Sequence, residues 1–128
     1  VQMSVSCDGV EIMNFGGDGV IVSTPTGSTA YSMSAGGPIV EPATKNIILT
    51  PICAHDMRTK AIVTSPQRRI TVEIGRIGRK SAFLSVDGGR ALRLSTGDRI
   101  TVTRSQHTTR LVRLTRREFF DVVKNKFR

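Results

Sequence analysis

The chain has 128 residues, the length of one ordinary domain, and 38% of them are hydrophobic while 23% are charged. This balance excludes a disordered chain, and the size allows a core without metals or disulfides. No apolar run reaches the roughly 20 residues of a spanning helix, so we expect no transmembrane segment and no membrane partner. The only cysteines, Cys7 and Cys53, predict free thiols and a cytoplasmic location.

The net charge of +9 is unevenly placed, because all 19 lysines and arginines lie in residues 45–128. A basic run is most often a solvated surface. The alternatives are a patch for a polyanion or a nucleotide phosphate, and a contact with an acidic partner segment. Trp is absent and Tyr occurs once, which counts against a nucleic-acid binder that stacks bases.

Valine, isoleucine and threonine make up about 30% of the chain, a composition typical of strands. Alternating segments at 2–6 and 10–15 flank Cys7-Asp8-Gly9 and predict a hairpin. A short strand at 20–22, a loop at 23–28 and a helix at 29–35 follow, and Gly36-Gly37-Pro38 ends the helix.

Short segments spaced by turn residues fill most of the remaining chain. They predict strands at 47–52, 61–65, 70–74, 82–86, 91–94, 99–104 and 109–115. A closing helix at 116–127 carries an apolar stripe, which we expect to pack: Phe119, Phe120, Val123 and Phe127. The prediction is a single, mainly β domain over 1–128, β-sandwich-like, with a short helix after the 23–28 loop and a C-terminal helix.

The loop after the 20–22 strand is rich in hydroxyl groups, which come from Ser23, Thr24, Thr26, Ser28 and Thr29. Ser28 or Thr29 can cap the following helix, and the unused hydroxyls and N–H groups then face one space. Gly27 allows a ligand to approach the backbone closely. The pattern indicates a small-molecule recognition loop; the alternative is a plain helix cap.

Two further side chains are candidates beside this loop. Asp18 lies between two glycines, where its carboxylate can accept hydrogen bonds from ribose hydroxyls or an amide. It can equally be an Asx-turn residue. Tyr31 can stack on a planar ring, or it can be a core aromatic with a wet tip.

The other chemical groups predict little. His55 and His107 have no cysteine or acid at ligand spacing, so we expect no metal site in this chain. The two cysteines lack a redox motif. Ser23, His55 and Asp87 lack a nucleophile elbow, which argues against a hydrolase. Asp87-Gly88-Gly89 can be a hairpin turn and nothing more.

Several of these segments together resemble the NAD kinase family. They are Asp18-Gly19, Ser-Thr-Pro-Thr-Gly-Ser-Thr-Ala-Tyr at 23–31 and Ser-Ala-Gly-Gly-Pro at 34–38. Thr-Pro-Ile-Cys at 50–53, His55 and Ser-Val-Asp-Gly at 85–88 extend the resemblance, which is tightest over 16–55. It covers nearly the whole chain.

The resemblance implies the C-terminal, NAD-binding domain of a two-domain enzyme. That enzyme transfers the γ-phosphoryl group of ATP, with Mg²⁺, to the adenosine ribose 2′-hydroxyl of NAD. The N-terminal domain, with its ATP loop and Asn-Glu pair, is absent from this chain. Gly16-Gly17-Asp18-Gly19 spells the ATP-loop motif but runs directly into the hydroxyl loop, so we do not assign Asp18 as the catalytic aspartate. We expect no catalytic residue here and negligible kinase activity from the chain alone.

The resemblance also implies a set of NAD-binding residues. Thr29 and Ala30 would read the adenine edge or its ribose, Tyr31 the ring or ribose, and Asp18 the other half of the dinucleotide. Gly16 stands where the family commonly has a basic residue. The complete set is Gly16, Asp18, Thr26, Thr29, Ala30, Tyr31, Ser32, Met33, Ser34 and Gly88.

The family's sheet domain also tends to mediate contacts between subunits, so the resemblance implies a homo-oligomer. Two alternatives remain open. One is a lipid-kinase C-terminal domain, which shares the architecture but lacks the hydroxyl loop. The other is a basic β-domain that binds nucleic acid without catalysis.

Overall fold

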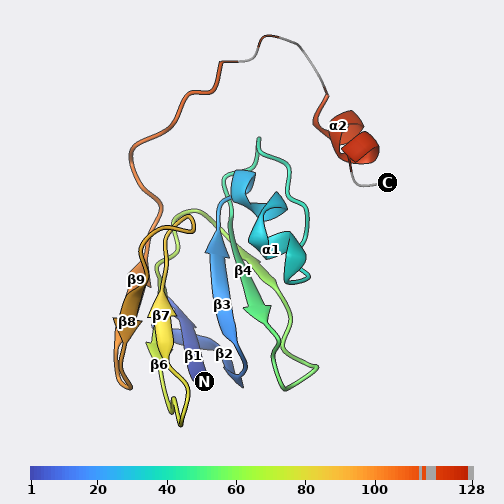
Figure 1. The fold of residues 1–128 in the computed structure, drawn as a ribbon. Coiled ribbons are helices and arrows are strands. Elements are labelled where there is room, and N and C mark those ends of the chain that lie inside the picture. The colour runs from blue at the N-terminus through green and yellow to red at the C-terminus, as the bar shows by residue number, and fades with distance from the viewer. Residues whose placement is uncertain (113, 115–117, 127–128) are drawn as a thin grey trace.

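The computed structural model describes residues 1–112, 114 and 118–126, and antiparallel strands dominate it (Figure 1). One sheet contains, in spatial order, β2 (Val10–Gly16), β1 (Gln2–Cys7), β6 (Ile70–Ile74) and β9 (Arg99–Val102). A second contains β3 (Gly19–Ser23), β4 (Ile47–Ile52) and β5 (Ile62–Thr64). A third pairs β7 (Ala82–Leu84) with β8 (Leu92–Leu94). The mainly β prediction is confirmed, and these strands begin and end within two residues of their predicted limits.

The first hairpin forms where the sequence places it. Strands β1 and β2 pair antiparallel from Cys7 opposite Val10, with Asp8 and Gly9 as the turn. Their φ angles are 49° and 84°. A two-residue hairpin turn of this kind needs positive φ at both positions, which Asp-Gly tolerates well.

The core lies between the first two sheets. Met3 and Val5 of β1 project inward, and so do Ile47 and Leu49 of β4 in the second sheet. The other buried members are Met13, Phe15, Ile70, Val72, Ile74 and Ala82. Because one cluster draws side chains from facing sheets, the sandwich-like prediction is confirmed.

Strand β4 is buried on both faces. Successive side chains of a strand point to opposite sides, so Ile47 and Leu49 face the core while Ile48 and Thr50 face away from it. Ile48 and Thr50 are nevertheless only 0% and 1% exposed. Figure 1 shows the helical segment between β3 and β4 lying beside these two strands. That segment, which carries the candidate loop, is packed on the second sheet.

The helical segment is divided, whereas the sequence predicts one helix over 29–35. A 3₁₀ turn, η1 (Thr26–Thr29), is followed by a single α-helical turn, α1 (Tyr31–Ser34). Ala30 separates them with φ −91° and ψ −133°, outside the helical region. The α-helix therefore begins at Tyr31, two residues later than predicted, and a tighter 3₁₀ turn precedes it.

After β9, residues 103–112 lead away from the sheets in Figure 1, and the last described element is α2 (Phe119–Lys126). The predicted helix 116–127 is confirmed over those residues, while 116, 117 and 127 lie outside the described ones. The predicted strand 109–115 is wrong for 109–112 and 114, which form no strand; 113 and 115 lie outside the described residues. Leu111 and Val112 are 73% and 89% exposed, so this segment has strand-like composition without a partner strand.

The apolar stripe of α2 does not pack as expected. The rings of Phe119 and Phe120 meet edge to face, with centroids 5.1 Å apart, but Phe120 is 55% exposed. Helix α2 buries none of its described residues completely, and Phe127 lies outside them. Among the helices of the described residues, none has the length and apolarity to cross a membrane.

Candidate functional site

The hydroxyl-rich loop is held by its own hydrogen bonds. The Gly27 amide donates to the Thr24 hydroxyl oxygen at 3.1 Å. The Ser28 and Ala30 amides donate to the carbonyl oxygens of Pro25 and Gly27, each also at 3.1 Å. These bonds close η1 two residues after β3 and keep the loop compact.

Two serines of the loop face inward. Ser28 is 0% exposed; its hydroxyl donates to the Pro25 carbonyl at 2.7 Å and accepts from the Val40 amide at 3.0 Å. Ser32 is 1% exposed, and its hydroxyl lies 2.8 Å from that of Thr50. The expectation that Ser28 or Thr29 caps the helix is wrong, because the residue before α1 is Ala30 and makes no side-chain cap. Ser28 instead ties the loop to the returning chain.

The opposite face of the loop is open. Thr26, Ala30, Tyr31 and Ser34 are exposed, and Thr29 and Met33 are half-buried. Tyr31 is 61% exposed, so it is not a core aromatic. The inward residues 28 and 32 and the outward residues 26, 30 and 34 each repeat every four positions. This spacing separates the anchoring face from the face that a ligand can reach.

Asp18 lies at the far end of β3 from this loop. Five strand residues separate them, which corresponds to roughly 16 Å. The Asp18 amide donates to the Ile52 carbonyl at 2.9 Å, and the side chain is exposed. Within the described part of the chain its carboxylate accepts no hydrogen bond, so the Asx-turn alternative is not supported. Asp18 presents a free acceptor at the edge of the second sheet.

Close backbone contacts fix the segment that carries Asp18. The Gly17 amide donates to the Val1 carbonyl at 3.0 Å, and the His55 amide donates to the Gly16 carbonyl at 2.8 Å. A Cβ on Gly17 would lie 3.0 Å from the Ile52 carbonyl oxygen. A Cβ on Gly16 would meet the His55 ring nitrogen Nδ1 at 3.3 Å. Gly16 therefore lies two residues before Asp18, in a segment where glycine allows close packing.

Gly88 belongs to a separate hairpin, between β7 and β8. Asp87 and Gly88 have φ angles of 51° and 69°, and the Gly89 amide donates to the Val86 carbonyl at 2.9 Å. These features complete a tight turn with left-handed residues at both central positions. Turn formation accounts for Asp87-Gly88 by itself, and all of 85–91 is exposed.

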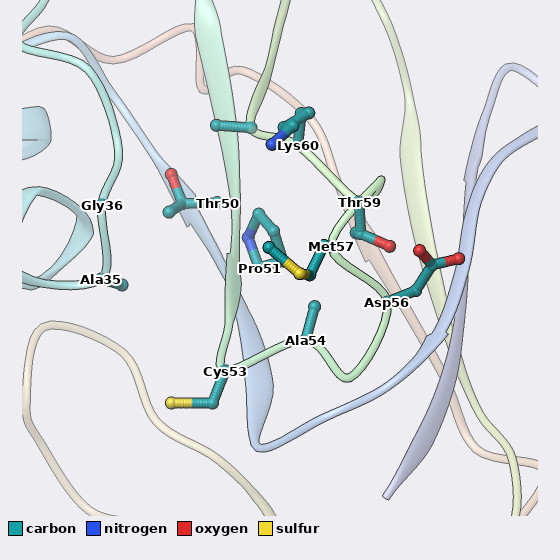
Figure 2. A pocket seen from close by; sticks show the side chains of 11 residues that line it. Ala35, Gly36, Thr50, Pro51, Cys53, Ala54, Asp56, Met57, Thr59 and Lys60 are labelled. Atoms are coloured by element: carbon teal, nitrogen blue, oxygen red, sulfur yellow. The ribbon is translucent and has the colours of Figure 1, made fainter.

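A cavity of about 240 Å³ lies between the end of α1, strand β4 and the loop that follows β4 (Figure 2). Asp56 and Lys60 are its charged lining groups, and Cys53 stands where β4 ends, with a φ of 48°. The remaining lining residues are Ala35, Gly36, Thr50, Pro51, Ala54, Met57, Thr59 and Ala61. Sequence reasoning did not include Asp56 or Lys60 in the site; their closeness to the Thr-Pro-Ile-Cys stretch was the available signal.

The two charged residues that line this cavity, Asp56 and Lys60, differ in whether they form an ion pair. Arg58 donates hydrogen bonds to Asp56 through its side chain, at 3.0 and 3.2 Å, and through its amide at 2.9 Å. The Arg58 side chain, and then its amide, lowers the pKa of the Asp56 carboxyl below its usual value. Lys60 has no ion pair within the described residues. The cavity therefore offers one neutralised carboxylate and one available ammonium group.

Residues 1–114 match the family model of the ATP-NAD kinase C-terminal domain. The chain belongs to the ATP-NAD kinase family. NAD kinase from Ruminiclostridium cellulolyticum is 39% identical over 126 residues, which is 98% of this chain and 44% of that protein. The chain thus spans less than half the length of this relative.

Two solved structures agree with this assignment. An NAD kinase from Archaeoglobus fulgidus in complex with ATP superposes with a TM-score of 0.72 and 36% identity, over 82% of this chain and 39% of that one. Yeast NADH kinase complexed with NADH superposes with a TM-score of 0.74 and 38% identity, over 80% of this chain and 29% of that one. The mainly β domain is therefore the family's C-terminal domain, and neither the lipid-kinase nor the nucleic-acid alternative is favoured.

Proposed function

We propose that this ATP-NAD kinase domain holds NAD while a phosphoryl group is transferred from ATP to the adenosine ribose 2′-hydroxyl. The observation that carries the proposal is the open face of the loop, with Thr26, Tyr31 and Ser34 exposed in one short segment. Hydroxyls and an exposed ring suit a nucleoside, which offers several polar edges and a planar base. The NADH-bound and ATP-bound relatives support the same ligand classes.

In this proposal the loop takes the adenosine half of NAD. Thr26, Thr29 and Ser34 contribute hydrogen-bonding groups, Ala30 allows close approach, and Tyr31 contacts the base or its ribose. Ser32, which is buried, and Met33, which is half-buried, contribute through the position of α1.

Asp18 serves the other half of the dinucleotide, and its distance from the loop along β3 suits an extended ligand. Its unpaired carboxylate can accept hydrogen bonds from ribose hydroxyls. Gly16, two residues before Asp18, and Gly88, in the turn between β7 and β8, complete the residues of the proposed site. Lys60 adds a cationic group to the cavity between β4 and the end of α1, and an ammonium group suits phosphate oxygens.

ATP, Mg²⁺ and the catalytic carboxylate belong to the part of the enzyme outside this chain. Within the described residues, no three His, Cys, Asp or Glu side chains gather closely enough to hold a metal ion. These residues do not fit a Mg²⁺ site of their own. The 128 residues alone are expected to form no NADP from NAD and ATP.

The test is NAD binding by the intact protein, measured by titration calorimetry, with Tyr31→Ala as the variant. Stacking of a base on an aromatic ring contributes about 1–3 kcal/mol, so the dissociation constant should rise roughly 5-fold to 150-fold. Phe83→Ala is the matched control, because Phe83 is 59% exposed but lies on β7. Nicotinamide mononucleotide should bind weakly to every variant. Equal NAD affinity in Tyr31→Ala and the parent protein would contradict the proposed site.

Self-association and a cytoplasmic location are parts of the same proposal. Cys7 and Cys53 are both free thiols, which suits a reducing compartment. Strands β2 and β9 are the edge strands of the four-stranded sheet, and β3 and β5 are those of the three-stranded sheet. These edges are available for strand pairing between subunits. Light scattering on the intact protein measures the oligomeric state directly.

A further inference from the structure

We infer that Thr50 is a positioning residue for the NAD site, acting through the hydroxyl of Ser32 on the turn that carries Tyr31. The inference rests on the proposed function. Thr50 lies on the outer face of β4, the face covered by the helical segment. Its hydroxyl is 2.8 Å from that of Ser32, and the two residues are each 1% exposed. Because water does not reach either group, the two hydroxyls satisfy each other.

The tether matters because α1 is very short. It contains four residues, and an isolated helix of that length is not stable in water. Its position must therefore come from contacts with the sheet. Ser32, its only buried residue, makes the contact with β4 through Thr50. Tyr31 precedes Ser32 directly, so a shift of Ser32 moves the exposed ring as well.

Gly37 closes the same contact from the other side. Its amide donates to the Ser32 carbonyl at 2.8 Å. A Cβ at Gly37 would lie 2.5 Å from the Ser32 hydroxyl and 2.7 Å from the Thr50 hydroxyl. The hydroxyl pair is thus enclosed between the sheet, α1 and the returning backbone, and Ser32 and Thr50 are each only 1% exposed. Ser32 consequently acts by position and does not touch NAD with its side chain.

This assignment makes a specific prediction for a double-mutant cycle. Thr50→Val and Ser32→Ala each remove one hydroxyl and leave the other buried without a partner. Each variant of the intact protein should raise KM for NAD about 10-fold, because a displaced Tyr31 loses part of its contact with NAD and a tenfold change in affinity corresponds to only about 1.4 kcal/mol. KM for ATP should stay constant. The double variant should be no worse than the more affected single variant, because both changes break one interaction.

The controls separate positioning from loss of fold. Thr50→Ser keeps the hydroxyl and should restore KM for NAD close to the parent value. Thr101→Val makes the same substitution at an exposed position of β9 and should change neither KM. A purely structural role of Thr50 would reduce the fraction of active protein, which lowers kcat while both KM values stay constant; that pattern would overturn the inference.

A second measurement does not depend on activity. Hydrogen exchange at the Gly37 amide reports whether the turn is held, because that amide is bonded to the Ser32 carbonyl. Exchange should become faster in Thr50→Val and return to the parent rate in Thr50→Ser. Unchanged exchange in Thr50→Val would overturn the tether itself. If exchange responds but the parent protein neither binds NAD nor forms NADP, the proposed function fails and the positioning role falls with it, while the tether stands.

Discussion

Gly37→Ala is the sharpest test of how the candidate loop is packed. The new Cβ would lie 2.5 Å from the Ser32 hydroxyl, 2.7 Å from the Ser32 carbonyl oxygen and 2.7 Å from the Thr50 hydroxyl. Real Cβ atoms essentially never approach other atoms this closely. One of the three neighbours is backbone, so a change of side-chain rotamer cannot relieve all of the contacts. Either α1 moves away from β4 or the hydroxyl pair separates.

The loss in the free energy of unfolding that we expect for Gly37→Ala follows from these two consequences. Overpacking a well-packed site costs about 1–3 kcal/mol. Separating a buried hydroxyl pair adds about 1–3 kcal/mol. The replacement of glycine returns about 0.4–1 kcal/mol through the unfolded chain. The free energy of unfolding should therefore fall by roughly 1–6 kcal/mol, a large part of the roughly 5–15 kcal/mol that holds a typical protein folded.

The assay is urea unfolding followed by circular dichroism, with Gly19→Ala as the matched control. At Gly19 the added Cβ meets the tip of the flexible Ile52 side chain at 3.2 Å. That side chain can move, so Gly19→Ala should change the free energy of unfolding by less than about 1 kcal/mol. If Gly37→Ala unfolds at the same urea concentration as Gly19→Ala, the enclosure around Ser32 and Thr50 does not exist as described.

Two further predictions concern stability. The Arg69 amide and then the Arg68 guanidinium lower the pKa of the Asp8 carboxyl, through hydrogen bonds of 2.9 and 3.0 Å. Because this pKa is lower in the folded protein, the ionised carboxylate stabilises the fold above the unfolded pKa of about 3.9. This stabilisation is lost as the pH falls through the folded pKa. The urea midpoint of Asp8→Asn should thus lie below that of the parent protein at neutral pH and approach it in acid; a constant difference at all pH values would refute this. Ser28→Ala should lower the free energy of unfolding by about 1–3 kcal/mol, because the Val40 amide loses its hydrogen-bond acceptor. Hydrogen exchange at that amide should become faster for the same reason. Ser34→Ala, at an exposed hydroxyl of the same segment, should leave both measurements unchanged.

The strands and the first hairpin could be predicted from sequence because their signals are local. Alternation and β-branched composition mark the strands, and Asp8-Gly9 supplies the positive φ angles that the turn needs. The same local signals fail at 109–112, where strand-like residues have no neighbouring strand. A strand is stabilised by its hydrogen-bonded partner, and the sequence of one segment does not say whether a partner is present.

The sequence by itself predicted residues 23–34 as the candidate functional segment, from their hydroxyls and from their resemblance to the NAD kinase family. An excess of hydroxyls is visible in the letters, whatever the fold. The tertiary structure decided which hydroxyls a ligand can reach. Ser28 and Ser32 are as polar as Thr26 and Ser34, yet they are buried and bonded within the protein. The direction of a side chain depends on what packs against its turn, and for Ser32 that is Thr50, eighteen residues further along the chain.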